Sequence, residues 1–298
     1  MTAKVIMNPF SGRWSALENR ERLENALQSA GLDYKLELTE RPGHGSEIAA
    51  TAVRAGFERI IAAGGDGTIS EIVNGMFHGA EGGPLPVFGI LPTGTANDLA
   101  DNLGLSKDPI QAAKVLVGDN THNLDVIRVN ERYFVNNAGL GLEPFVTLQQ
   151  EKMRRLRGNL RYMIATLRAI MQNPSWHMQL EWDDGSYDGP ITMISIGNCI
   201  RTGGLFYTVP HADPFDGKLT FIYGFVSGRL RIMRALPMIM RPDEGNITEH
   251  PAINEVHATW LNVNATTPTP AHADGELFSK SIQKLEYRVL PGRLRLLM

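Results

Sequence analysis

Five consecutive residues, Gly64-Gly65-Asp66-Gly67-Thr68, have the composition of a phosphate-binding turn. The apolar run Ile60–Ala63 precedes them, and a helical pattern with Ile69 and Ile72 follows. A glycine-rich turn at a helix N-terminus offers backbone N–H groups and a positive dipole end to an anion. Asp66 cannot itself attract phosphate, so its carboxylate indicates a bound metal ion or ordered water. The turn is predicted to bind nucleotide phosphates near Mg²⁺; the alternative is an ordinary Gly/Asp turn.

Two further loops combine glycine with small polar side chains. Asn8-Pro9-Phe10-Ser11-Gly12 follows the apolar run Val5–Met7, and Thr93-Gly94-Thr95-Ala96-Asn97-Asp98 comes shortly after Val87–Leu91. Hydroxyl and amide groups in such turns suit contacts with a nucleotide or substrate, and Asp98 could hold a metal ion or a hydroxyl. An ordinary strand-to-helix loop remains the alternative for the first, and a helix cap for the second.

Carboxylates recur in three other places. In Asp274-Gly275-Glu276, either acidic residue could accept the proton of an alcohol during phosphoryl transfer, although a simple hairpin turn is the alternative. Asp213-Pro214-Phe215-Asp216-Gly217-Lys218 offers oxygen ligands at a density that suits Mg²⁺ or Ca²⁺, and a simple turn explains it equally well. Asp125 stands alone, at a point where a carboxylate could face a cleft.

The first half of the chain alternates strand and helix patterns. Strands are predicted at Val5–Met7, Tyr34–Thr39, Arg59–Ala63 and Val87–Leu91, and helices at Ser15–Ala30, Glu47–Ala55 and Leu99–Leu103. This order predicts a mostly parallel sheet with helices on both faces. Ligands of such sheets bind at the carboxyl ends of the strands, where all three small-residue loops begin. The loops are therefore expected to line one crevice.

After about residue 125, short β patterns with hairpin turns predominate. Strands are expected at Lys218–Tyr223, Glu255–Asn264 and Lys284–Leu290. The segment Thr266-Thr267-Pro268-Thr269-Pro270 is predicted to be a stiff loop. We predict an α/β nucleotide-binding domain over residues 1–127, joined by 290–298 if the terminal strand returns to it, and an antiparallel β-rich domain over 128–289.

The composition is that of a globular, cytoplasmic protein. The chain has 298 residues, 43% of them hydrophobic and 20% charged, and a net charge of −3, which argues against broad binding to nucleic acid. No apolar run reaches the roughly 20 residues needed to cross a bilayer, and the N-terminus lacks a signal peptide. The single cysteine, Cys199, excludes an internal disulfide and is expected to be buried.

The segment Lys152–Met171 has an amphipathic pattern. Its apolar residues include Met163 and Leu167, and at a helical period four arginines fall within about 60° of one another. These are Arg154, Arg157, Arg161 and Arg168. Each basic residue near an anionic bilayer contributes about 1 kcal/mol, so this face could dock reversibly on a membrane surface. The alternative is a solvated arginine face with surface ion pairs.

Taken together, the motifs resemble those of the diacylglycerol kinase catalytic family, in particular the soluble bacterial lipid kinases, with sphingosine kinases and NAD kinases as relatives. Seven motifs occur in order along nearly the whole chain. They are Asn8-Pro9-x-Ser11-Gly12, Thr39 with Gly43-His44, Gly64–Thr68, Leu91–Asp98, Leu124-Asp125-Val126, Asn136-Asn137-x-Gly139-x-Gly141 and Asp274-Gly275-Glu276. The family's usual Gly-His-Ala is Gly43-His44-Gly45 here, which loosens that loop without touching a proposed catalytic group.

The resemblance implies a Rossmann-like nucleotide domain followed by a β-sandwich-like domain, with the active site between them. It implies ATP as the phosphoryl donor, bound by residues of the small-residue loops and their neighbours. These are Asn8, Pro9, Ser11, Gly12, Thr39, Gly64, Gly65, Asp66, Gly67, Thr68, Glu71, Thr93, Gly94, Thr95 and Asn97.

For catalysis the resemblance implies Glu276 as the general base, supported by Asp66 and Asp98. A structural Mg²⁺ is expected near Asp213, Asp216 and Lys218, the first and last through their carbonyl groups. A catalytic Mg²⁺ is expected near Asp66, Asp98 and Asp125, partly through water.

The function expected is ATP- and Mg²⁺-dependent phosphorylation of a lipid alcohol such as diacylglycerol. Reversible contact with a membrane surface is also expected. The sequence does not determine the oligomeric state, and a homodimer is one alternative. A kinase of NAD or another small molecule is the nearest alternative. A nucleotide- and lipid-binding regulator without activity is the other, although retention of Glu276, Asp66 and Asp98 argues against it.

Overall fold

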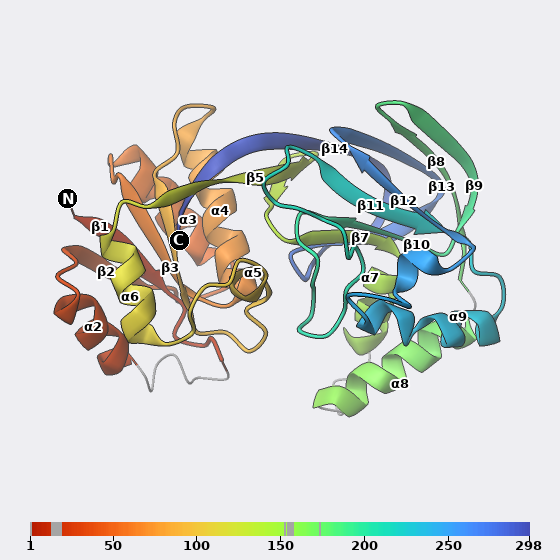
Figure 1. Ribbon diagram of the computed structural model, residues 1–298, viewed down its shortest axis with the longest axis horizontal. Helices are drawn as coiled ribbons and strands as arrows, with labels where there is room; N and C mark the ends of the chain where they lie inside the picture. Colours follow the sequence, from red (N-terminus) through yellow and green to blue (C-terminus); the bar gives the residue numbers. More distant parts are fainter. Residues whose placement is uncertain (1, 13–19, 152, 154–157, 173) are drawn as a thin grey trace. The chain divides into compact units, whose positions relative to one another are not determined.

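The computed structural model describes residues 2–12, 20–151, 153, 158–172 and 174–298 (Figure 1). The chain folds into two compact units. Unit 1 consists of Met1–Val126, Arg132–Val135 and Leu290–Met298, and unit 2 consists of Ile127–Glu131 and Asn136–Val289. Two strands, β5 (Thr121–Val129) and β14 (Glu276–Leu297), have residues in both units.

Unit 1 is built on a parallel sheet, as the alternation of strand and helix patterns predicts. Its strands follow the order β2 (Tyr34–Leu38), β1 (Ala3–Met7), β3 (Arg59–Gly64), β4 (Val87–Pro92) and the C-terminal end of β14. Leu296 of β14 pairs in parallel with Phe88 of β4. The last strand of the chain thus returns to unit 1, and the short β6 (Arg132–Phe134) pairs with β5.

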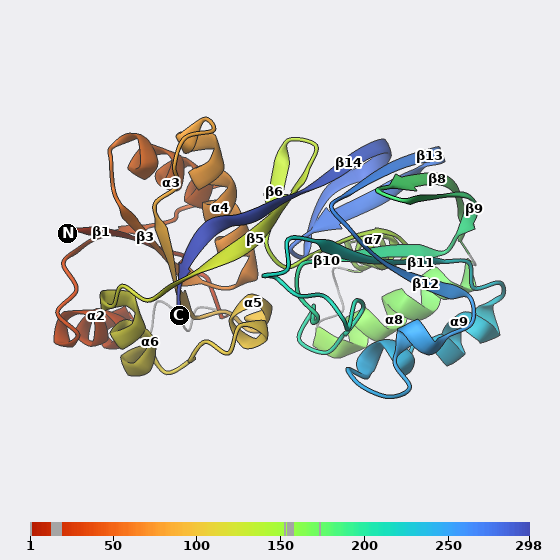
Figure 2. The same cartoon turned by 45° about the horizontal axis from the view of Figure 1, so that its top comes forward.

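Helices cover both faces of this sheet (Figures 1 and 2). α2 (Arg20–Ser29) and α6 (Pro109–Val117) pack on one face, where Val5, Met7 and Ile61 are buried with Leu27 and Leu116. α3 (His44–Arg54) and α4 (Asp66–Ala80) lie on the other face, and the short α5 (Asp98–Asn102) follows β4. Alternate side chains of each strand project from opposite faces of the sheet. Because helices cover both faces, these strands consist of continuous apolar runs in the sequence.

α3 and α4 pack closely because glycines of α4 face the backbone of α3. A Cβ atom at Gly75 would lie 2.2 Å from the carbonyl oxygen of Ser46, and one at Gly79 would lie 2.6 Å from that of Ala50. Neither position has room for a side chain. Because α4 begins at Asp66, this packing fixes the helix whose N-terminus forms the glycine-rich turn.

Unit 2 contains the predicted antiparallel strands. A sheet runs in the order β12 (Ile253–Ala258), β11 (Leu219–Gly224), β10 (Met193–Gly197), β7 (Asn137–Gly141), β13 (Trp260–Ala273) and β14. β8 (Trp176–Trp182) pairs with the first half of β13 and with β9 (Gly185–Ile191), whereas the end of β13 pairs with β7. α7 (Leu142–Glu151), α8 (Gly158–Met171) and α9 (Arg229–Ala235) share a buried apolar cluster with residues of β11 and β12.

Two expectations for this half were wrong. The run Glu255–Asn264 is not one strand, because β12 ends at Ala258 and β13 begins at Trp260. The segment Thr266–Pro270 is not a loop but the middle of β13, where the register with β14 shifts between Asn264 and Thr269. A β-bulge tolerates prolines, which cannot donate to the ladder, so Pro268 and Pro270 do not end the strand.

The predicted amphipathic helix is represented by α8. Arg154 and Arg157 lie outside the described residues, as does the first part of the helix predicted at Ser15–Ala30. In α8 Ala165, Ala169 and Ile170 are buried, whereas Met163 and Leu167 are exposed rather than packed. No helix among the described residues is long and apolar enough to cross a membrane.

The glycine packing of α4 makes a testable prediction. Replacing Gly75 with alanine places a methyl group against the carbonyl of Ser46, so the free energy of unfolding should fall by about 2 kcal/mol, a typical cost of overpacking. Gly118→Ala is the control, because the nearest atom to its new methyl group would be Val115 O, 3.3 Å away, and a loss under about 0.5 kcal/mol is expected there. Equal denaturation midpoints for the Gly75 variant and the parent chain would contradict this packing.

Candidate active site

The glycine-rich turn of unit 1 joins the carboxyl end of β3 to the N-terminus of α4. Gly65 is the residue before the helix, and its carbonyl accepts the first helical hydrogen bond, from Ile69 N, at 3.0 Å. A Cβ atom at Gly64 would lie 2.4 Å from the side chain of Thr68, so the turn closes only with glycine there. The N–H groups of the first helical turn have no partner within the helix, which is the arrangement that binds anions.

The three small-residue loops meet at this edge of the sheet. Thr93 N donates to Gly64 O at 2.9 Å, and Asn8 Nδ2 donates to Thr68 Oγ1 at 3.0 Å. A Cβ atom at Gly94 would lie 2.4 Å from the Cα of Gly65, so these two turns pack backbone against backbone. Their meeting, expected from the strand order, therefore depends on glycine at both positions.

Asn97 and Asp66 hold the Thr93–Asp98 loop in place. Asn97 adopts a left-handed φ of 52°, and its amide accepts from Gly94 N at 2.8 Å and donates to Gly94 O at 3.0 Å. Asp66 Oδ1 accepts from Leu99 N at 3.2 Å, which ties the glycine-rich turn to the start of α5. Asn97 precedes that helix without making the side-chain cap considered as its alternative role.

Two of the predicted nucleotide contacts have structural partners. Glu71 accepts from Gly43 N at 2.8 Å and from Gly45 N at 3.0 Å, so both of its oxygens hold the N-terminal end of α3. Thr39 is buried, and its N–H donates to Met7 O. Their contact with a nucleotide stays a prediction.

One polar atom at the meeting point of the loops lacks a partner. Thr93 Oγ1 is buried without a hydrogen bond to any described residue, and Thr95 beside it is exposed. A buried hydroxyl of this kind, beside glycine turns with little side-chain cover, fits a phosphate-bearing ligand.

The carboxylates predicted to bind metal do not form a three-ligand cluster. Among the described residues, no group of three or more His, Cys, Asp or Glu side chains could hold a metal ion. Asp125 accepts from Gly292 N at 2.6 Å, and Asp213 and Asp216 each accept a backbone N–H two residues further on. Mg²⁺ often keeps several waters and needs one or two carboxylates, so both predicted ions stay predictions.

In unit 2 Asp274-Gly275-Glu276 forms the tight turn between β13 and β14. Asp274 and Gly275 have φ angles of 47° and 80°, the left-handed pair of a two-residue hairpin. The carboxylate of Asp274 accepts from Asn136 N at 2.9 Å, and its own N–H donates to Asn137 O at 2.7 Å. Glu276 is exposed at the start of β14. The turn therefore fixes Asp274 and leaves the side chain of Glu276 at the surface.

A buried ionic group lies near this turn, and sequence reasoning missed it. His272 Nε2 is 3.0 Å from Glu143 Oε1, and Ser195 Oγ donates to Glu143 Oε2 at 3.1 Å. Burial favours the neutral form of Glu143, but the charge of His272 together with the hydrogen bonds from His272 and Ser195 outweighs this and holds the pKa of the carboxyl below its usual value. Burial likewise acts to lower the pKa of His272, yet the carboxylate of Glu143 raises it. The two groups therefore form an ion pair.

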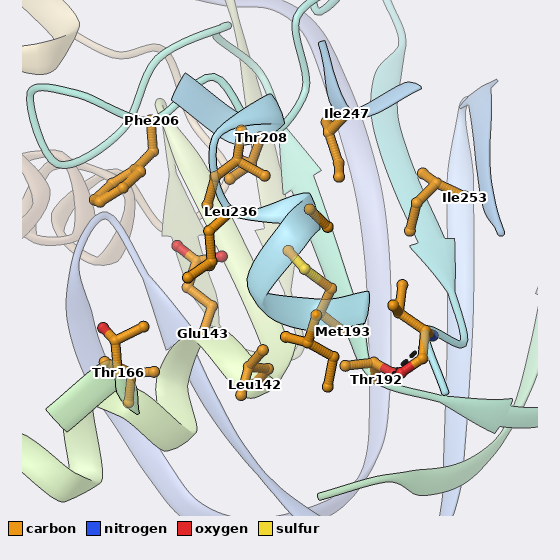
Figure 3. Close-up of a pocket in the computed structure, with 15 residues that line it drawn as sticks. Leu142, Glu143, Thr166, Thr192, Met193, Phe206, Thr208, Leu236, Ile247 and Ile253 are labelled. Carbon is orange, nitrogen blue, oxygen red and sulfur yellow. Dashed lines mark hydrogen bonds between the residues drawn. The ribbon is translucent and has the colours of Figure 1, made fainter. Parts of the chain in front are cut away.

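Glu143 also lines an apolar pocket within unit 2 (Figure 3). Eleven of the fifteen lining residues are apolar, and they come from α7, β10, α9, the start of β12 and the segments that follow β10, β11 and α9. The space inside it that admits the centre of a water-sized sphere is about 70 Å³, and the larger volume of about 700 Å³ that is free of protein atoms includes open solvent. Such a pocket suits an apolar ligand with few polar groups. Its residues are scattered over more than a hundred positions, so no local motif reveals it.

Comparison with known proteins identifies the two units. Residues 2–129 match the family model described as the diacylglycerol kinase catalytic domain. Residues 136–298 match the model described as the YegS C-terminal NAD kinase beta sandwich-like domain. These are the two parts of one two-domain kinase fold. The chain belongs to the diacylglycerol kinase family, and it is an enzyme of the lipid-kinase class.

Individual relatives agree with this assignment. The chain is 29% identical over 279 residues to a diacylglycerol kinase of Staphylococcus haemolyticus, covering 93% of this chain and 83% of the relative. It is 28% identical over 279 residues to one of Staphylococcus aureus, covering 93% and 87%. The crystal structure of a diacylglycerol kinase from Bacillus anthracis has the same fold, with a TM-score of 0.79 at 22% identity over 99% of this chain and 96% of that one.

The ion pair of unit 2 makes stability depend on pH. His272→Gln leaves the carboxylate of Glu143 without its counter-charge, so the free energy of unfolding should fall by about 3 kcal/mol. The pair stabilises fully between the usual pKa values of 4.5 for Glu and 6.5 for His. That contribution declines as pH rises through the raised pKa of His272, or falls through the lowered pKa of Glu143.

Denaturant unfolding at about pH 5.5 and about pH 9 checks this, and the difference between variant and parent should shrink at the higher pH. His177→Gln serves as control, because its ion pair with Asp188 is exposed, at 53% and 58%, and should contribute little. A difference independent of pH would show that the two groups are not paired as ions.

Proposed function

We propose that this lipid kinase transfers the γ-phosphoryl group of ATP to the hydroxyl of a lipid alcohol such as diacylglycerol, in a reaction that depends on Mg²⁺. The observation that carries the lipid part of the proposal is the apolar pocket of unit 2, which a soluble acceptor such as NAD would not need. The names of the bacterial relatives support diacylglycerol as the acceptor.

ATP is assigned to the three loops at the carboxyl edge of the unit 1 sheet. The backbone N–H groups after Gly65 and the buried hydroxyl of Thr93 support contacts with the phosphates. The remaining proposed contacts are those predicted from the sequence, at Asn8, Pro9, Ser11, Gly12, Thr39, Gly64, Asp66, Gly67, Thr68, Glu71, Gly94, Thr95 and Asn97. Mg²⁺, when bound, would neutralise phosphate charge as the phosphoryl group moves.

Glu276 is proposed as the general base. Its carboxylate accepts the proton of the lipid hydroxyl while the hydroxyl oxygen bonds to the γ-phosphorus and the bond to the leaving ADP oxygen breaks. Asp66, Asp98 and Asp125 are proposed for the catalytic Mg²⁺, and Asp213, Asp216 and Lys218 for a structural one. Asp66 Oδ1 also accepts from Leu99 N, and within the described residues its Oδ2 remains to act on the ion or its water.

Membrane contact is proposed at the exposed apolar side chains of unit 2. Met163 and Leu167 of α8 are 54% and 40% exposed, and Leu230 of α9 is 71% exposed. Arg168 is exposed on α8, and α9 has arginines at 229, 231 and 234. Exposed apolar residues among basic ones suit reversible docking on an anionic lipid surface, from which the acceptor would be taken. A contribution from Arg154, Arg157 and Arg161 and a homodimer stay predictions.

The first test of the base is Glu276→Gln, which keeps the shape of the side chain and removes its basicity. We expect kcat for diacylglycerol in mixed micelles with labelled ATP to fall by about 10²-fold or more, with little change in the KM for ATP. Glu286→Gln, on the exposed part of the same strand, is the matched control and should keep full activity. Normal turnover by the Glu276 variant would remove it from the proposed role.

Asp66→Asn tests the carboxylate of the glycine-rich turn. The amide oxygen can still accept from Leu99 N, so the fold should persist, while the negative charge is lost. Because this transition state depends mainly on charge stabilisation, kcat should fall by about 10²-fold or more, as for the base. Asp119→Asn is the matched control, at a position that is 99% exposed. An Asp66 variant with unchanged kcat would contradict the proposal, and label in NAD rather than in any lipid would reassign the acceptor.

A further inference from the structure

The structure distinguishes the two acidic residues that the sequence left open as proton acceptors. Asp274 is 7% exposed and begins the turn between β13 and β14, whereas Glu276 is exposed at the start of β14. A general base has to reach the proton of a bound substrate. The exposed residue meets that requirement, so the buried carboxylate calls for a different role.

The strand register places Glu276 on one face of the sheet of unit 2. Glu276 is opposite Ala273, which in turn is opposite Ala138 of β7, so these three side chains project from the same face. His272 stands one residue before Ala273 and therefore projects from the other face, where it pairs with Glu143. The proposed base and the ion pair thus lie on opposite faces, and the groups that orient the base have to be sought in the turn itself.

Two hydrogen bonds tie this turn to β7 beyond the end of the regular pairing with β13. Asp274 N donates to Asn137 O at 2.7 Å, and the carboxylate of Asp274 accepts from Asn136 N at 2.9 Å. Asn136 is itself held from the other side, because its carbonyl accepts from Asn198 N at 2.8 Å and from Cys199 N at 3.2 Å. Asp274 therefore fastens the turn, through its main chain and its side chain, to a segment that is already fixed.

The backbone of the turn needs such a restraint. Asp274 has a φ of 47°, a left-handed conformation that residues other than glycine rarely adopt. Gly275 follows with a φ of 80°, and a Cβ atom there would meet no atom of the described chain within 4 Å. Packing against Gly275 therefore does not hold the turn. The hydrogen bond between Asn136 N and the carboxylate of Asp274 restrains it immediately before Glu276.

We propose that Asp274 is a positioning residue for the phosphoryl transfer, which acts through Glu276 and takes no proton itself. Its carboxylate accepts from Asn136 N, a task that needs an oxygen atom at that place and does not need a negative charge. Holding the turn keeps the carboxylate of Glu276 where the substrate hydroxyl loses its proton, and a displacement of about 1 Å there can cost roughly 10²-fold in rate. This inference rests on the proposed function, in which Glu276 is the base.

Two substitutions separate the oxygen atom of Asp274 from its charge. Asp274→Asn keeps an oxygen that can accept from Asn136 N, and asparagine tolerates a positive φ, so kcat should stay within about threefold of the parent value. Asp274→Gly also tolerates this φ but removes the acceptor, so kcat should fall by about 10- to 100-fold. The KM for ATP should stay within about twofold in both variants, because the proposed ATP loops belong to unit 1. The assay uses diacylglycerol in mixed micelles with labelled ATP and Mg²⁺.

A double variant shows whether Asp274 acts through Glu276. Glu276→Gln already removes the base, so adding Asp274→Gly should lower kcat by no more than about twofold further. If Asp274 merely supported the structure of unit 2, the two losses would multiply. This readout therefore separates a positioning role from a structural one.

Asn130→Gly is the matched control. Asn130 also has a positive φ, 51°, and its side-chain oxygen also accepts a backbone N–H of β14, that of Glu286, at 2.9 Å. The same residue is introduced and a hydrogen bond of the same kind is lost, but at the far side of the strand from Glu276 in sequence. Both glycine variants should lower Tm by about 2–4 °C, the effect of one lost hydrogen bond, and only Asp274→Gly should lower kcat.

The outcomes are distinguishable. A slow Asp274→Gly enzyme, a nearly normal Asp274→Asn enzyme and no further loss in the double variant support the inference. Full kcat in Asp274→Gly overturns it and leaves Glu276 as the base, as do losses that multiply in the double variant. A loss in Asp274→Asn as large as that in Glu276→Gln also overturns it, even if the glycine variant does not fold. Full kcat in Glu276→Gln alone shows that the proposed base is wrong, and the inference fails with it.

Discussion

The backbone contact between Gly65 and Gly94 is the constraint on which the rest of unit 1 depends. A methyl group on either residue would lie within 3 Å of the other's backbone, so the turns after β3 and β4 meet only as glycines. Their meeting in turn brings Asp66 to Leu99 N and leaves Thr93 Oγ1 buried without a partner among the described residues. Because parallel strands end at one edge of the sheet, glycine turns after two of them suffice to bring these loops into contact.

Glycine serves a different purpose in each unit. In α4, Gly75 and Gly79 allow one helix to approach another, which fixes the dipole end that faces the glycine-rich turn. In β7, Gly139 clears a space over a sheet, and Glu143 enters it from a neighbouring helix. In the first case the missing side chain lets backbones touch, and in the second it admits a charged group to the interior. Gly139 stands in one of the sequence motifs, whereas Gly75 and Gly79 stand in none of them.

Much of the fold was predictable because its signals are local. Apolar runs followed by glycine turns predicted the parallel strands of unit 1. Short β patterns with hairpin turns predicted the β-rich character of unit 2. The prolines at 268 and 270 led to the wrong prediction of a loop. A bulge in a long strand tolerates prolines, whereas a regular ladder of hydrogen bonds excludes them. Sequence reasoning could not reach the pocket or the Glu143–His272 pair, because each depends on strand register or on residues far apart in sequence. The same holds for the buried side chain of Asn137, which has no partner within the described residues.

The path of β14 has a consequence for how the chain comes to its final structure during synthesis. Unit 1 contains the first 126 residues, but residues 290–298 supply one strand of its parallel sheet. A chain made from its N-terminus therefore finishes every residue of unit 2 before the sheet of unit 1 can be completed. Until then β4 has an unpaired edge, a surface prone to pairing with other chains. Residues 290–298 thus complete the sheet of unit 1, and a ribosome paused before them holds that sheet with one unpaired edge.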